Sequence, residues 1–329
     1  MSNARPPSSA AAPSPGKTLR LAMLGMIPGN GHPYSWSAII NGYDPVAMAP
    51  CPYPTIPQYL GAQPLEKVKV PGAQVTHIWT DNLDEARLVA KASLIPHVVD
   101  RPEDVIGQVD AVFISTDDGY DHIRRARPFV EAGLAVFVDK PLAISIRDLQ
   151  TFINWEKAGA RILSSSGARY HPGLDSWEAD RAKFGELRWL TSTSTKYWEN
   201  YAIHAVQPIY RMLGPGFTSV RMESQQPKYT VGQIRHHSGV EITVPIIYDC
   251  SGGISVYGTA SHGPIGGGDT YVAFRRQMVA FIDFVRSGVK PYPFSETIEL
   301  MAVLIAGLRS REQGSRRVEV SEIMGELQT

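Results

Sequence analysis

Several classes of protein are excluded by what the sequence lacks. Its only two cysteines, Cys51 and Cys250, lie far apart in 329 residues and outside any Cys/His ligand spacing, so neither a disulfide framework nor a zinc site is expected, and we predict no metal. Lys plus Arg and Asp plus Glu both total 32, which leaves no basic surplus for nucleic acid. No apolar run approaches the roughly 20 residues of a membrane span. We therefore expect a cytoplasmic protein with no nucleic-acid or membrane partner.

The chain is long enough for two hydrophobic cores. At 329 residues and 43% hydrophobic content it exceeds what one compact core usually serves. Residues 1–17 are rich in Pro, Ser and Ala, lack the apolar middle of a secretory signal, and are expected to form a disordered tail. The two domains are predicted at 18–166 and 167–329, where the pattern of the sequence changes.

A strand, a glycine-rich loop and a helix are predicted in succession near the start. The apolar run 19–24 (LRLAML) stops at Gly25, further glycines follow at Gly29 and Gly31, and Pro33 suits the first turn of a helix. Glycines let a backbone approach a pyrophosphate, and the N-terminal end of the helix favours its charge. The loop, with Met26 and Ile27 included, is thus a candidate dinucleotide site. Ile27 replaces the usual second glycine, so a plain glycine turn remains the alternative.

An acidic residue follows the next predicted strand, 75–80 (VTHIWT). Asp81 could accept hydrogen bonds from the adenosine ribose hydroxyls, which favours NAD, since a carboxylate repels the 2′-phosphate of NADP. Arg87 nearby leaves NADP possible. The alternative is that Asp81 merely caps the following helix, DEARLVAKA.

Further along, strands alternate with helices. A strand at 110–116, a polar loop, a helix ending near residue 132 and a strand at 135–138 predict a parallel, doubly wound Rossmann-type sheet, whose ligands bind beyond the carboxyl ends of its strands. Ser115, Thr116 and Tyr120 would lie near the cofactor, and Asp139 and Lys140 would face the same crevice.

A proline-rich insert at 42–71 separates the glycine loop from the second strand. Loops of this length are often functional. Tyr43, Asp44, Tyr53 and Tyr59 are candidates for a lid or a substrate wall, and an inert surface excursion is the alternative.

Several ordered motifs resemble one family. These are AGLAVFVDKPLA after DAVFIST, GARYHP at 167–172, FGELRWL, and the C-terminal FSETIELMAVLIAGLRSREQGSRRVEV. Together they resemble the Gfo/Idh/MocA family, named for glucose-fructose oxidoreductase and inositol 2-dehydrogenase. The resemblance covers nearly the whole chain. It implies an NAD(P)-dependent oxidoreductase in which the lysine, here Lys140 after Asp139, lies between nicotinamide and substrate.

The second catalytic segment of that family commonly reads Asp, three residues, His, two residues, Asp. Here NYAIHAVQ supplies Asn200, His204 and Gln207, so the histidine is retained and both carboxylates are replaced by amides. An amide can orient an imidazole by hydrogen bonding, but it cannot take a proton or stabilise imidazolium by charge.

Oxidation of an alcohol requires a group that takes the hydroxyl proton as the carbon loses hydride. The resemblance implies that Lys140 polarises or deprotonates the hydroxyl, with His204 exchanging the proton and Asn200 fixing geometry. Substrate contacts are expected from Arg169, Tyr170, Trp198 and Gln207. The alternatives are a surface lysine and a core histidine.

From about Gly167, short β-rich stretches separated by turns replace the alternating pattern, which predicts an α+β domain with a large open, mainly antiparallel sheet. Helices at 206–213 and 270–286 should cover one face. The resemblance implies a homodimer or homotetramer built through the other face.

The expected function is hydride transfer between NAD, or NADP, and a hydroxyl or carbonyl of a sugar, inositol or related polyol. Two alternatives stay open. One is a glycosidase or epimerase that reduces NAD only transiently, and the other is a ligand-sensing protein that kept the fold without catalysis.

Overall fold

The computed structural model describes residues 16–266 and 268–327, with the side chains of residues 224 and 225 excepted. The tail predicted at 1–17 thus lies almost entirely outside the described residues. Contacts divide the chain into two units. Unit 1 comprises the described part of Met1–Asp139 with Thr151–Ser164 and Phe274–Tyr292, and unit 2 comprises Lys140–Gln150, Ser165–Ala273 and the described part of Pro293–Thr329. Each unit is therefore assembled from separate stretches of the sequence.

Unit 1 is built on a six-stranded parallel sheet. Its elements are β1 (Leu19–Leu24), α1 (His32–Asn41), α2 (Pro45–Met48), α3 (Thr55–Gly61), η1 (Leu65–Lys67), β2 (Ala73–Trp79), α4 (Leu83–Ala92), β3 (His97–Val98), η2 (Pro102–Val105), β4 (Ala111–Ile114), α5 (His122–Glu131), β5 (Ala135–Val138), β6 (Ile162–Leu163), and parts of α6 (Ile146–Lys157) and α9 (Thr270–Ser287). The strand order β3-β2-β1-β4-β5-β6 is that of a doubly wound dinucleotide-binding sheet. This confirms the predicted Rossmann-type fold.

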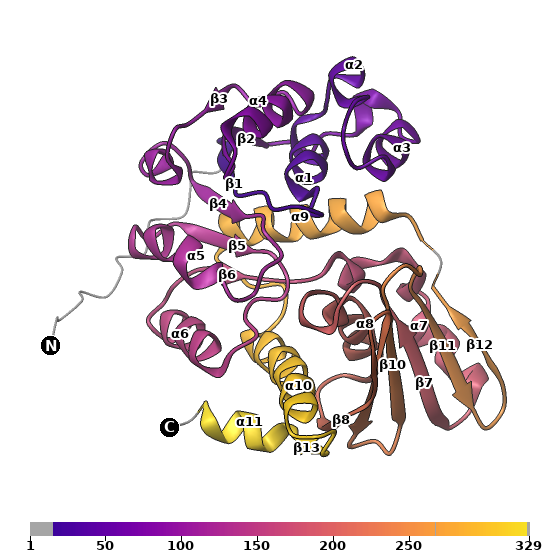
Figure 1. Cartoon of the computed structure of the whole chain (residues 1–329). Helices are drawn as coiled ribbons and strands as arrows, with labels where there is room; N and C mark the ends of the chain where they lie inside the picture. Colours follow the sequence, from indigo (N-terminus) through magenta and orange to yellow (C-terminus); the bar gives the residue numbers. More distant parts are fainter. Residues whose placement is uncertain (1–15, 267, 328–329) are drawn as a thin grey trace, which may run out of the picture. The chain divides into compact units, whose positions relative to one another are not determined.

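Aromatic side chains hold α1 and α9 to one face of this sheet, where the two helices lie side by side (Figure 1). The ring of Trp36 lies 5.4 Å from Phe137 on β5, and Phe281 of α9 lies 4.8 Å from Phe113 on β4. The expectation that residues 270–286 cover the second sheet is therefore wrong for most of this helix. From Phe274 onward its residues belong to unit 1, because their large rings fill the groove over β4 and β5.

The insert at 42–71 folds into α2, α3 and η1 and packs within unit 1. Asp44 caps α2 through hydrogen bonds from Val46 and Ala47, and the Tyr59 hydroxyl donates to Ser35 at 2.5 Å. Burial raises the pKa of the Tyr53 phenol, and the Gly29 N–H that donates to it opposes this effect. The insert is thus anchored to the glycine loop and to α1.

Unit 2 contains a mixed, mostly antiparallel sheet of seven strands. Its elements are η3 (Gly167–Tyr170), η4 (Pro172–Leu174), α7 (Trp177–Asp180), η5 (Arg181–Phe184), β7 (Leu187–Thr193), α8 (Trp198–Leu213), β8 (Phe217–Gln226), β9 (Tyr229–His236), β10 (Glu241–Ile247), β11 (Gly253–Gly258), β12 (His262–Ile265), α10 (Phe294–Glu312), β13 (Val318–Glu319) and α11 (Val320–Glu326). The order is β12-β11-β7-β10-β9-β8-β13, and among the described strands of this sheet only β7 and β10 pair in parallel. The predicted fold class is confirmed for this unit too.

Alternating burial along β10 shows why the sheet of unit 2 has one covered face. Ile242, Val244 and Ile246 are fully buried, and the residues between them are partly exposed. Helices α8 and α10 supply the cover (Figure 1). Within the described residues, no helix is both long and apolar enough to cross a bilayer.

Candidate functional site

Two residues of the glycine loop in unit 1 have a backbone conformation that favours glycine. Gly25, which follows β1, and Gly29 have φ of 93° and 84°, in the left-handed region that favours glycine. A Cβ on Gly25 would lie 2.8 Å from Thr116, so this backbone also passes close to the residues after β4. The structure thus explains why these two positions are glycine, and their role in binding a dinucleotide stays a prediction.

Position 31 requires glycine for a different reason. A Cβ there would lie 2.6 Å from the ring of Tyr53 and 2.7 Å from Ile56, both contributed by the insert. Glycine is needed at this position because an aromatic ring packs on the backbone. Met26 is buried and its N–H lies 3.4 Å from Asp81, and Ile27 is partly exposed.

The polar residues after β4 lie against the glycine loop. The Ser115 hydroxyl donates to the Gly25 carbonyl at 2.7 Å, so it fixes the backbone of the loop. The Thr116 side chain is buried, and its hydroxyl has no hydrogen-bond partner among the described residues. Such an orphaned group beside a glycine loop is what a site for a polar ligand provides. Tyr120, in contrast, is 59% exposed.

Asp81 does not cap α4. The cap is Asn82, whose side chain accepts from the N–H of Asp84. Asp81 instead pairs with Arg125 of α5 through two bonds, Nη2 to Oδ1 at 2.7 Å and Nη1 to Oδ2 at 3.1 Å. The cation at this position is therefore Arg125, which sequence analysis did not select. Arg87, which it did select, pairs with Asp84 and is 62% exposed.

Asp121 anchors Arg125 from the other side. It accepts from the Arg125 Nε at 2.6 Å and from Arg124 at 2.7 and 2.8 Å. Burial acts to raise the pKa of the Asp121 carboxyl, but the hydrogen bonds from the two arginines outweigh it and the pKa lies below its usual value. A carboxylate that stays ionised keeps Arg125 in place beside the loop.

Asp139, which follows β5, forms a hydrogen bond with a histidine. Its fully buried carboxylate lies 2.5 Å from His32 Nδ1 and accepts from Asn30 Nδ2 at 3.1 Å. The His32 ring also stacks on Trp36, with centroids 4.2 Å apart. Sequence analysis missed His32 and Asn30, although both stand in the glycine loop or directly after it. A polar side chain in such a loop is the signal that could have found them.

In unit 2, Lys140 lies in a cluster with residues of α8. Lys140 is only 2% exposed, and its Nζ lies 4.2 Å from the centre of the Tyr201 ring and 3.5 Å from the Asn200 carbonyl. The Nζ of Lys196 lies 4.3 Å from the same ring. Lys196 has a φ of 58°, a strained conformation of the kind that concentrates at functional sites.

His204 belongs to the same cluster. Its ring lies 4.8 Å from that of Tyr201, one turn earlier on α8. Its Nδ1 lies 2.6 Å from the hydroxyl of Ser166, which also accepts from the Ala168 N–H. Ser166 is thus a site residue that sequence analysis missed, since nothing in its local pattern marks it.

The two amides that replace the family carboxylates have distinct environments. Gln207 is buried, and its Oε1 accepts from the Ser166 N–H at 2.6 Å. It therefore supports the residue that faces His204. The side-chain Oδ1 of Asn200 is buried and has no hydrogen-bond partner within the described part of the chain. This acceptor suits a ligand hydroxyl.

The other residues predicted to contact substrate have different environments in unit 2. Trp198 is 1% exposed, its indole N–H donates to the Leu304 carbonyl, and Gly232 and Gly307 leave room for its ring, so packing accounts for it. Arg169 pairs with Glu296 of α10 at 2.8 Å, and Tyr170 ends the short helix η3 that follows Ser166.

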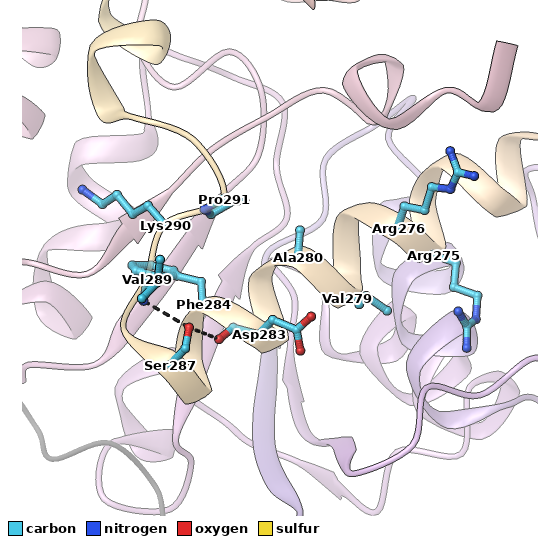
Figure 2. Close-up of a pocket in the computed structure, with 10 residues that line it drawn as sticks. All are labelled: Arg275, Arg276, Val279, Ala280, Asp283, Phe284, Ser287, Val289, Lys290 and Pro291. Carbon is cyan, nitrogen blue, oxygen red and sulfur yellow. Dashed lines mark hydrogen bonds between the residues drawn. The ribbon is translucent and has the colours of Figure 1, made fainter. Parts of the chain in front are cut away.

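A cavity of about 450 Å³ lies in unit 1 along the last turns of α9 (Figure 2). It is lined by residues that sequence analysis did not select: Arg275, Arg276, Val279, Ala280, Asp283, Phe284, Ser287, Val289, Lys290 and Pro291. Lys290 lies at one end and the two arginines at the other, where they point in different directions (Figure 2). The basic groups do not converge, so this cavity does not form a defined anion site. Among the described residues no three His, Cys, Asp or Glu side chains could hold a metal ion.

Comparisons with known proteins agree with these observations. Residues 58–166 match the model of the Gfo/Idh/MocA family, described as an oxidoreductase family with an NAD-binding Rossmann fold. No curated protein sequence matches the chain.

Solved structures of dehydrogenases share the fold over almost the whole chain. A probable dehydrogenase from Thermotoga maritima is 15% identical with a TM-score of 0.71, covering 93% of this chain and 100% of its own. Myo-inositol 2-dehydrogenase from Lactobacillus plantarum is 15% identical with a TM-score of 0.72, covering 92% and 99%. Scyllo-inositol dehydrogenase from Lactobacillus casei, with bound NAD(H) and scyllo-inositol, is 14% identical with a TM-score of 0.71, covering 93% and 100%. Residues 58–166 therefore resemble the Gfo/Idh/MocA oxidoreductase family, as the motifs of the sequence indicated, and the solved structures show that the chain shares the fold of these dehydrogenases.

Proposed function

We propose that the protein is an NAD-dependent dehydrogenase or reductase that acts on a CH–OH group, or the corresponding carbonyl, of a sugar, inositol or related polyol. The observation that carries this proposal is the cluster of Lys140, Tyr201, His204 and Ser166 in unit 2. Asp139 is the last residue of its segment of unit 1 and Lys140 begins unit 2, so one peptide bond joins the cofactor unit to this cluster. The inositol dehydrogenases among the structural relatives support the choice of substrate class.

Each unit contributes a separate part of the chemistry. In unit 1 the loop from Gly25 to Gly29 and the carboxylate of Asp81 would hold the dinucleotide. A nicotinamide dinucleotide held there would supply the hydride acceptor for oxidation of the alcohol carbon.

The residues of unit 2 would manage the oxygen and its proton. The Lys140 ammonium donates to the reacting oxygen and stabilises negative charge as the alkoxide forms. His204 takes the hydroxyl proton at Nε2, since its Nδ1 is engaged by Ser166. The Asn200 Oδ1 accepts a neighbouring substrate hydroxyl, which orients the polyol. In the reverse direction the same groups return the proton to the carbonyl oxygen.

The first test replaces the ammonium. Lys140→Met keeps a stem of the same length and removes the ammonium, so turnover should fall by about 100- to 1000-fold, the scale of losing a group that stabilises the transition-state charge. The assay follows NADH fluorescence with a panel of inositols, sugars and glycosides. Binding of NADH, measured by energy transfer from tryptophan, should change little.

The matched control is Lys183→Met, which removes an exposed lysine paired with Asp180 and should leave turnover unchanged. Full activity of Lys140→Met would refute the assignment. Product formation without net NADH would instead indicate transient redox chemistry and contradict a dehydrogenase.

We also propose that the open face of the sheet in unit 2 mediates self-association. Trp189 on β7 and Tyr257 on β11 stand opposite each other in register and are 39% and 44% exposed. Neighbouring exposed aromatic residues are typical of protein interfaces. Light scattering should detect a dimer or tetramer, and Trp189→Glu should shift it toward the monomer.

A further inference from the structure

Arg125 occupies a position that decides how the ribose end of a dinucleotide is recognised. Its guanidinium pairs with both oxygens of Asp81, the carboxylate that follows β2. Its Nη1 would also lie 3.1 Å from a Cβ placed on Gly25, so the guanidinium is beside the glycine loop. The Nε bond to Asp121 fixes it there, and the side chain is only 10% exposed.

We propose that Asp81 and Arg125 form a charge-balanced ribose site, which accepts NADP(H) as well as NAD(H), and that Arg125 is the residue that determines this choice. The inference rests on the dinucleotide site of the proposed function and goes beyond it, since a ribose site with Asp81 alone would favour NAD.

A carboxylate at the end of the second strand accepts from the ribose hydroxyls of NAD and repels the 2′-phosphate of NADP, and a nearby arginine reverses this preference. In unit 1 the carboxylates of Asp81 and Asp121 are matched by the guanidinium groups of Arg125 and Arg124, so an incoming phosphate meets no net negative charge. Asp81 is 39% exposed, which leaves its carboxylate accessible to ribose hydroxyls as well.

The hydrogen-bond capacity of Arg125 supports the same conclusion. A guanidinium has five N–H donors. Its three bonds to Asp81 and Asp121 use one donor each on Nη1, Nη2 and Nε, so one further N–H on each terminal nitrogen lies outside these bonds. These two N–H groups lie on different edges of the guanidinium, so a phosphate would receive a single charge-assisted hydrogen bond from one of them. The guanidinium is also held in advance by Asp121, so little side-chain freedom is lost on binding.

The test measures binding rather than turnover. NADH and NADPH are titrated into the full-length protein, and energy transfer from tryptophan to the reduced nicotinamide gives each Kd. For the wild type we expect the two Kd values to agree within about tenfold. Arg125→Met should raise the Kd of NADPH by about 10- to 100-fold, the scale of a hydrogen-bonded charged contact, and change that of NADH by less than about threefold.

Two further variants complete the design. Arg87→Met removes an arginine that pairs with Asp84 on exposed α4, so the ratio of the two Kd values should not change. Asp81→Asn keeps Arg125 and removes the carboxylate, so the ratio should move toward NADPH. This variant also tests the proposal if Arg125→Met fails to fold.

The outcomes separate this inference from the proposed function. A wild-type preference for NADH of more than about 100-fold, or an equal loss of both dinucleotides in Arg125→Met, would overturn the role of Arg125 and leave a dehydrogenase intact. Binding of neither dinucleotide would overturn the proposed function and this inference with it.

Discussion

The two histidines of the candidate site are held at Nδ1 by different chemical groups. In unit 1, Nδ1 of His32 lies 2.5 Å from the buried carboxylate of Asp139. In unit 2, Nδ1 of His204 lies 2.6 Å from the hydroxyl of Ser166. An ionised carboxylate only accepts, so it fixes the proton of His32 on Nδ1, whereas a hydroxyl donates or accepts. His204 can therefore use either tautomer.

This difference suits different tasks. A carboxylate stabilises imidazolium and gives a ring one orientation, which is a structural role for a residue beside the glycine loop. A hydroxyl adds no charge, so Ser166 orients the ring through Nδ1 without favouring imidazolium, and Nε2 of His204 stays available to exchange a proton with the substrate oxygen. The replacement of the family carboxylates by Asn200 and Gln207 thus leaves a histidine whose Nδ1 partner is neutral.

Removal of the Asp139 carboxylate should have the largest effect on stability. Asp139→Ala leaves His32 and Asn30 without their shared acceptor in a buried place, so the free energy of unfolding should fall by about 3 kcal/mol. Ser166→Ala removes a neutral hydroxyl and should cost only about 1 kcal/mol. Urea unfolding followed by tryptophan fluorescence measures both, since Trp36 stacks on His32.

The control for this experiment is Asp84→Ala. Asp84 forms an exposed pair with Arg87 and is itself 85% exposed, so its loss should cost no more than about 0.5 kcal/mol. If Asp139→Ala were no more destabilising than this control, the buried pair would not be a structural element of unit 1.

Replacing Ser166, the partner of His204 Nδ1, should change both the activity and its dependence on pH. Ser166→Ala should lower kcat/KM by about 10-fold, because the imidazole loses the group that orients it. Ser166→Asp supplies a carboxylate, which stabilises imidazolium, so activity on the acid side should be lost at a higher pH than in the wild type. The measurement is kcat/KM against pH, with the polyol found by the substrate panel.

A shifted pH profile distinguishes positioning from simple structural support, because a merely structural serine would lower activity equally at every pH. The charged groups near this part of α8 remain in both variants: Lys140 and Lys196 beside Tyr201, and Arg169 paired with Glu296. An unchanged profile in Ser166→Asp would contradict the role given to Ser166.

Local pattern explains which parts of the fold could be predicted from the sequence. The strands at 19–24 and 135–138 are as predicted, because a short apolar run that ends at a glycine or a charged residue has few alternatives. The helix at 270–286 was located but assigned to the wrong sheet. The apolar face of this helix indicates that it packs against a sheet, but the sequence does not say which one. The contacts of the helix with Phe113 and Phe137 identify the sheet of unit 1.

Local pattern also explains which residues of the candidate site could be predicted from the sequence. Lys140 and His204 were selected because a motif surrounds each of them. Arg125 and Ser166 were missed because their partners, Asp81 and His204, lie 44 and 38 residues away in the sequence. Trp198 stands beside a catalytic motif, but its ring packs in the space that Gly232 of β9 and Gly307 of α10 leave open. Partners supplied by distant segments are not visible in local spacing.

The smallest expected effect concerns the histidines outside the site. Burial lowers the pKa of His77 in unit 1 and of His171 and His236 in unit 2. The unfolded chain therefore binds these protons more readily than the folded one, so stability falls as pH drops below about 6.5, the ordinary histidine pKa, and the loss is complete below the folded pKa values. Urea unfolding at pH 7 and at pH 5 should show this decrease.

One variant isolates the contribution of unit 2. His236→Gln stays neutral throughout this range and can still hydrogen-bond toward Ser238 and the Pro215 carbonyl, so it should lose less stability between pH 7 and pH 5 than the wild type does. The control is His262→Gln at the exposed strand β12, which should lose as much as the wild type. Identical losses in all three proteins would show that protonation of His236 does not oppose folding, and the acid sensitivity would then have to arise from His77 and His171.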